Sequence, residues 1–178
     1  MRPARNEIKL NCDAAVGVNG FVVAGIVRDW RGSLVFSFVF KVNTNLLVQA
    51  ETEALRMAAS IVIEHNLHSI CLKSDCKSCI DGLLDSNTAV PWQIVNLVKE
   101  IRALVQCIPA ASFNWAPRSA NMAAHTLAPL VLKEQIVWFF LCLLCFSFCY
   151  VHYFEGRHFL LLVCCICTAF FLIKIFLS

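Results

Sequence analysis

The fold of this chain is decided by residues 7–16, Glu-Ile-Lys-Leu-Asn-Cys-Asp-Ala-Ala-Val. Apolar side chains at Ile8, Leu10 and Cys12 alternate with polar ones, and this period of two predicts a strand with one buried face. Asp13 lies on the opposite, polar face of that strand. A carboxylate in such a position is costly unless water or a bound group solvates it, so Asp13 marks a candidate site.

The segments that follow predict a mixed α/β domain. Apolar runs at 20–29 and 33–42 flank the turn Asp29-Trp30-Arg31-Gly32, which gives an antiparallel three-stranded meander. The period then becomes helical, and predicted helices (50–65, 76–84, 92–105 and 120–133) alternate with strands (69–72 and 111–115). This order predicts a mixed five-stranded sheet with helices on its faces over residues 6–133.

The composition divides the 178 residues into two parts. Of the 27 charged residues, only Glu155, Arg157 and Lys174 fall in 136–178, and the first 135 residues carry a net charge of only +2 (13 basic, 11 acidic). The sequence therefore indicates no broad basic face. A polyanion would have to be bound by a few basic residues at one place on the surface. Six of the eleven cysteines lie in the apolar tail, so we expect reduced thiols rather than a disulfide scaffold.

The apolar tail predicts two transmembrane helices, at 136–154 and 159–177. Each is close to the roughly 20 apolar residues that span a bilayer. A genuine tail would anchor the chain in a membrane with its N-terminal domain in the cytosol. Translated intron or frameshifted sequence would also give such a composition, and the domain would then be nuclear or cytoplasmic. The sequence does not indicate an oligomeric state.

Two further acids have positions that suit a site. Glu51 lies in the first turn of the long predicted helix, and Asp75 follows the strand 69–72. With Asp13, they form a set that can converge on a hard divalent cation, which prefers oxygen ligands. Taken singly, Glu51 could complement the helix dipole and Asp75 could be a helix N-cap.

These residues carry a resemblance to a known family. Five ordered motifs span about residues 6–130: Lys9-Leu10-Asn11-Cys12-Asp13-Ala14-Ala15, Gly25-Ile26-Val27-Arg28-Asp29 with Gly32, Ala50-Glu51-Thr52-Glu53-Ala54-Leu55, Ser74-Asp75-Cys76, and Phe113-Asn114-Trp115-Ala116-Pro117-Arg118 with Asn121 and Ala124-His125-Thr126-Leu127-Ala128. The set resembles the ribonuclease H type 1 family, and most closely its plant retroelement-type, reverse-transcriptase-like branch.

The resemblance implies a hydrolase that binds nucleic acid and cuts the RNA strand of an RNA/DNA hybrid endonucleolytically with two Mg²⁺ ions. Asp13, Glu51 and Asp75 match three of the family's four catalytic metal ligands. His125 stands at the fourth, where the catalytic pattern has an acid. Because nitrogen suits Mn²⁺ better than Mg²⁺, we expect weaker Mg²⁺ binding and relatively better activity in Mn²⁺. The alternative for His125 is a partly exposed helix residue without a role.

Contacts with the hybrid are expected at five further residues. Asn11 and Ser74 are candidates for 2′-hydroxyl contacts, and the candidates for phosphate contacts are Lys73, Lys77 and Arg118. Some members of the resembled family grip the hybrid with a basic protrusion. The segment between the predicted helices that end near 84 and begin near 91 leaves no room for one, so binding should be sensitive to salt. A catalytically weakened nucleic-acid-binding remnant of a retroelement, anchored in a membrane or not, is the alternative function.

The motif Cys76-Lys77-Ser78-Cys79 invites a zinc or redox interpretation. A zinc site would need a second ligand pair at suitable spacing, which the sequence lacks. We therefore interpret both cysteines as packing residues of a helix.

Overall fold

The structure is a computed structural model, and it describes residues 7–17, 20–134, 138–140, 150–154, 157–163 and 172–174, with side chains up to residue 129. Its first five strands form the predicted mixed sheet. β1 (Ile8–Gly17), β2 (Gly20–Arg28) and β3 (Leu34–Val42) pair antiparallel in sequence order.

The parallel part of the sheet lies on the other side of β1. β4 (Ser69–Ser74) pairs with β1, and β5 (Ala110–Trp115) pairs with β4, which gives the order β5-β4-β1-β2-β3. β1 is therefore central, with an antiparallel neighbour on one side and a parallel neighbour on the other. The central strand of the sheet carries Asp13.

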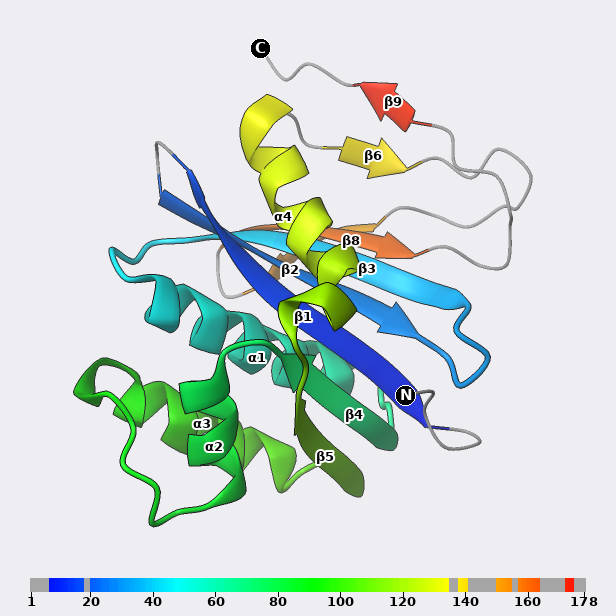
Figure 1. Ribbon diagram of the computed structural model, residues 1–178. Helices are drawn as coiled ribbons and strands as arrows, with labels where there is room; N and C mark the ends of the chain where they lie inside the picture. Colours follow the sequence, from blue (N-terminus) through cyan, green and yellow to red (C-terminus); the bar gives the residue numbers. More distant parts are fainter. Residues whose placement is uncertain are drawn as a thin grey trace.

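Helices cover both faces of this sheet (Figure 1). α1 (Leu47–Glu64) packs against β1 and β2, and α2 (Lys77–Leu84), η1 (Trp92–Ile94) and α3 (Val95–Val105) lie beside it. After η2 (Arg118–Ala120), α4 (Met122–Glu134) packs against β1 and β2 on the opposite face. The core between the sheet and α1 is apolar, and its fully buried members include Leu10, Leu55, Ile70 and Leu72.

Two helix starts differ from the sequence predictions. α1 begins at Leu47 rather than at residue 50, so Glu51 is not in its first turn and does not complement the helix dipole there. The N-cap of α2 is Cys76 rather than Ser74 or Asp75, and no side chain caps that helix. Both corrections remove a purely structural role for an acid of the predicted site.

The described pieces of the apolar tail are strands. They are β6 (Trp138–Phe140), β7 (Tyr150–Phe154), β8 (Arg157–Val163) and β9 (Leu172–Lys174), of which β8 pairs with β3 and extends the sheet at that edge. Most of the residues predicted to span a membrane, at 136–154 and 159–177, lie outside the described residues, so the anchor stays a prediction. Within the described part of the chain, no helix is long and apolar enough to cross a bilayer.

Candidate metal centre

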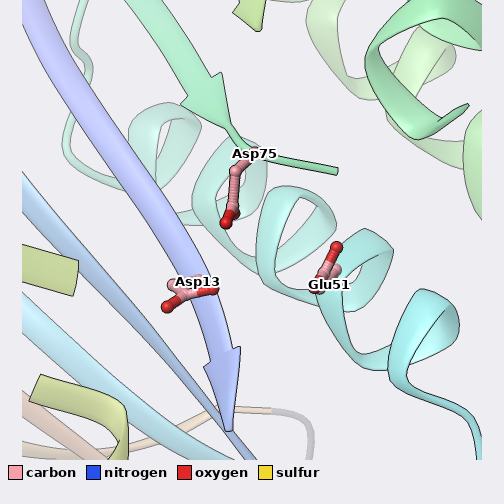
Figure 2. A group of neighbouring side chains, drawn as sticks. All are labelled: Asp13, Glu51 and Asp75. Atoms are coloured by element: carbon pink, nitrogen blue, oxygen red, sulfur yellow. The ribbon is translucent and has the colours of Figure 1, made fainter. Parts of the chain in front are cut away.

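Three carboxylates converge at the predicted site. Asp13, Glu51 and Asp75 each offer one oxygen, and these oxygens all lie within 4.8 Å of one another. Figure 2 shows the three side chains approaching from β1, from α1 and from the end of β4. Asp13 is only 3% exposed, while Glu51 and Asp75 are half-buried. The sequence prediction of one acid from each of three elements agrees with this geometry.

The register of the parallel strands explains why two of the acids meet. Asn11 of β1 pairs with Lys73 of β4. Asp13 lies two residues after Asn11, and Asp75 lies two residues after Lys73. The two segments therefore bring their acids to the same level of the sheet. Because β4 has already ended, Asp75 lies beyond the carboxyl end of a parallel strand, where α/β sheets commonly bind ligands.

The electrostatics of the cluster favour a bound cation. Burial raises the pKa of Asp13, the charge of Asp75 raises it further, and the hydrogen bond from His125 opposes this rise. Burial also raises the pKa of Glu51, as do the charges of the other two acids, against a hydrogen bond from the Cys76 thiol and the charge of Arg118. Ionising three close carboxylates is unfavourable without a positive charge among them. Hard oxygen donors in this arrangement fit a divalent cation such as Mg²⁺ or Mn²⁺.

His125 is held against the cluster by two partners. Its Nδ1 lies 2.7 Å from Oδ2 of Asp13, and a terminal guanidinium nitrogen of Arg118 lies 3.0 Å from its Nε2. Because a guanidinium only donates hydrogen bonds, Nε2 accepts here and the ring proton belongs on Nδ1, which donates to Asp13. Both ring nitrogens are thus occupied, and a ligand role for His125 stays a prediction that requires Arg118 or Asp13 to release the ring.

Asn121 connects three parts of the centre, and sequence reasoning gave it no role. It is 1% exposed, and its Nδ2 lies 2.7 Å from the carbonyl oxygen of Cys12 and 3.3 Å from Oδ1 of Asp75. Its Oδ1 accepts a hydrogen bond of 2.9 Å from the amide of Asn11. Asn121 therefore ties the start of α4 to β1 and to one acid. Its position four residues before His125, within the same motif, was the available signal.

The predicted nucleic-acid contacts fall into two groups. Asn11 and Ser74 are buried: the Asn11 amide pairs with Asn121, and Ser74 Oγ accepts from the backbone N–H of Cys76 at 3.1 Å. Their contact with a 2′-hydroxyl stays a prediction that requires these hydrogen bonds to open. The three cations lie nearer the surface. Lys77 pairs with Asp81 at 3.1 Å, Arg118 is exposed, and Lys73 is half-buried on β4.

The two cysteines of the C-x-x-C motif pack inside the domain. Burial raises the pKa of Cys76 to about 12 and that of Cys79 to about 11, so both are protonated thiols at neutral pH. Zinc binding needs thiolates. Neither thiol belongs to the group of ligand atoms that the described residues bring together.

The order of strands and the acid cluster define the ribonuclease H class of α/β domains. The chain belongs to the reverse transcriptase-like family, whose sequence profile it matches over residues 11–131. This match confirms the resemblance seen in the sequence, while the plant origin stays a prediction. No curated protein matches the chain significantly.

Solved structures share the fold at low sequence identity. Ribonuclease H1 from Halobacterium salinarum is 20% identical with a TM-score of 0.66, and the match covers 72% of this chain and 98% of that one. The N-terminal ribonuclease H domain of a Mycobacterium tuberculosis protein is 15% identical (TM-score 0.63; 71% and 94% covered). LC11 ribonuclease H1, from compost, was solved in complex with an RNA/DNA hybrid and is also 15% identical (TM-score 0.64; 72% and 99% covered).

Proposed function

We propose that this chain is a divalent-metal-dependent endonuclease that hydrolyses the RNA strand of RNA/DNA hybrids. The observation that carries the proposal is the convergence of Asp13, Glu51 and Asp75 on one point of a ribonuclease H fold. The family match and the likeness to a hybrid-bound ribonuclease H1 support the same substrate class.

Each acid has a separate task in this proposal. Asp13 extends from the central strand and is the most buried of the three acids, so we assign it the position that two cations would share. Glu51 and Asp75 each hold one side of the cluster. Divalent ions held by these three acids would, when bound, stabilise the attacking and the leaving oxygen of phosphodiester hydrolysis. Arg118, exposed beside His125, is placed to contact a phosphate of the substrate.

The fourth position modifies this activity. His125 adds no negative charge to the cluster. The site therefore attracts a second cation less strongly than it would with a fourth acid at this position. A nitrogen ligand, once freed from Arg118, would bind Mn²⁺ in preference to Mg²⁺. We therefore propose that two ions, with Mn²⁺ the better activator, serve the reaction.

A second candidate function is a nucleic-acid-binding remnant with little turnover. The favouring observation is that both nitrogens of His125 are already hydrogen-bonded, to Asp13 and to Arg118. In that case the domain would bind a hybrid and leave it intact.

Cleavage of a labelled RNA/DNA hybrid by the full chain in mild detergent tests the proposal. We expect cutting in Mn²⁺ and slower cutting in Mg²⁺, with a loss of roughly 10³-fold or more in Asp13→Asn, since an ion site is worth several kcal/mol. Asp81→Asn is the matched control, because that acid lies at the surface of α2, where its carboxylate pairs with Lys77. A folded chain that binds the hybrid but cuts in neither metal would reject the nuclease and favour the remnant.

A further inference from the structure

Three cations gather on the same face of the sheet as Asp13. Lys9 of β1 lies directly opposite Arg28 of β2, and Lys73 of β4 pairs with Asn11, two residues after Lys9. Residues opposite each other on neighbouring strands project to one face, and side chains two apart on a strand share it. Lys9, Arg28 and Lys73, here called the Lys9 cluster, therefore line one face together.

The charges of the Lys9 cluster are not neutralised by the part of the chain that the structure describes. Among the residues that the structure describes, the ion pairs of Arg56, Lys77 and His125 include no member of the Lys9 cluster. Burial lowers the pKa of Lys9, and repulsion from Lys73 and from Arg28 lowers it further. Like charges directly across a strand pair are destabilising. Such an arrangement costs stability in the free domain and is relieved by a bound anion.

Among the described elements the face around the cluster is only partly covered, since Lys9, Arg28 and Lys73 are each half-buried. α4 packs on β1 and β2. β4 and β5 lie on the other side of β1 from β2 (Figure 1). On β5 the residues in register with this face are Ser112 and Asn114, which are half-buried and exposed. The strip on β4 and β5 is thus polar and basic. It lies on the same face of the sheet as Asp13, with the buried Asn11 between Lys9 and that acid on β1.

We propose that the Lys9 cluster binds the phosphate backbone of the hybrid on one side of the cleavage point, as an extension of the nuclease function proposed above. Lys9 precedes Asp13 by four residues, about 13 Å along a strand at roughly 3.3 Å per residue. That span corresponds to about four base steps at roughly 3.4 Å each. A backbone of that length would extend from the acid cluster to the Lys9 cluster and would pass over the buried Asn11–Asn121 pair between them.

Salt dependence of hybrid binding tests this assignment without requiring cleavage. The full chain is titrated with the hybrid in EDTA, where hydrolysis does not proceed, between about 50 and 200 mM salt. In Lys9→Gln/Arg28→Gln we expect the slope of log K against log salt to become shallower by about 2, which is about 1 for each cation removed from a phosphate. Lys41→Gln/Lys99→Gln is the control: it removes the same charge from exposed positions elsewhere and should leave the slope unchanged.

The outcomes separate the two proposals. Equal slopes in the parent and in Lys9→Gln/Arg28→Gln would overturn the Lys9 cluster, even if the parent cuts the hybrid. If the parent never cuts the hybrid but the double variant shows a shallower slope, phosphate binding by the Lys9 cluster is supported and the nuclease function is rejected. If the double variant does not melt as a folded protein, Lys9→Gln and Arg28→Gln singly should each reduce the slope by about 1. Cluster-dependent binding to anionic phospholipid vesicles with an unchanged hybrid slope would also overturn the proposal.

Discussion

The two sides of the candidate metal centre are held in different ways. Asp13, Glu51 and Asp75 extend from β1, α1 and the end of β4, elements whose apolar faces form one core. His125 extends from α4 on the opposite face, and it reaches the centre through hydrogen bonds to Asp13 and Arg118. The acid side is thus fixed by packing, while the imidazole side depends on polar contacts that a ligand can replace.

This difference indicates how the site responds to change. Removing an acid leaves the packing intact and removes charge from the point where cations bind. Changing the imidazole side alters which partner Asp13 has and how easily a cation reaches it. Mutations on the two sides should therefore differ in size and in metal dependence.

After Asp13→Asn, the largest effect is expected from Asp75→Asn. The amide oxygen can still accept from Asn121, so the fold should be kept while one negative charge is lost. We expect hybrid cleavage to fall by roughly 10³-fold with an unchanged melting temperature. A loss of less than about tenfold, measured in single-turnover cleavage, would show that Asp75 is not one of the acids that support cleavage.

Asn121→Ala should have an intermediate effect, because Asn121 joins the two sides. Leaving the buried Asn11 amide and the Cys12 carbonyl without partners should lower the free energy of unfolding by about 1–3 kcal/mol. Cleavage should fall roughly 10–100-fold, as for other residues that orient metal ligands. Thr126→Ala, which removes an exposed hydroxyl bonded within α4, is the control. Equal behaviour of the two variants in denaturant melts would contradict this role.

His125→Asp sharpens the comparison further. An acid at this position would supply a fourth oxygen ligand, so we expect activity in Mg²⁺ to rise by about tenfold and the advantage of Mn²⁺ to shrink. His125→Ala should lower activity in Mn²⁺ more than in Mg²⁺. If the parent and both variants cut at the same rate in Mg²⁺, and also at the same rate in Mn²⁺, the ring takes no part in binding cations.

The smallest effect is on stability as a function of pH. Asp13 and Glu51 have pKa values raised above the ordinary 3.8 and 4.5 on folding, so the folded chain binds more protons over this range. Stability without metal should therefore fall as pH rises from about 4 through the raised pKa values, and it should fall less in Asp13→Asn. Thermal melts from about pH 4 to 7 in EDTA measure this slope. An identical slope in the parent and the variant would contradict the cause given for it.

Sequence reasoning predicted some parts of this molecule well, for physical reasons. The alternation around Asp13 predicted β1, because a period of two is typical of a strand. It did not predict that residues 10–15 are buried on both faces, because the polar side is covered by α4, which packs there from more than 100 residues away. The start of α1 was placed three residues late because periodicity detects buried positions, and the first buried residue of α1 is Ala50. Leu47, exposed at the true start, gives no such signal.

The centre itself could be predicted only as a set of candidates. The motifs suggested the three acids, but their meeting depends on the parallel register of β1 and β4, which no local pattern specifies. The pairing of His125 with Asp13 and Arg118, and the burial of Asn11 and Ser74, arise from the docking of α4 onto β1. Tertiary contacts of this kind, between residues more than 100 positions apart, have no local sequence signal.

Binding of Mn²⁺ is the most direct test of the central claim, that the three packed acids form a divalent-cation site. The free Mn²⁺ signal in electron paramagnetic resonance can be followed as the full chain is added, alongside Asp13→Asn and the surface control Asp81→Asn. The account predicts that the parent and Asp81→Asn remove Mn²⁺ from solution and that Asp13→Asn does so at least tenfold more weakly. Equal binding by all three proteins would contradict it.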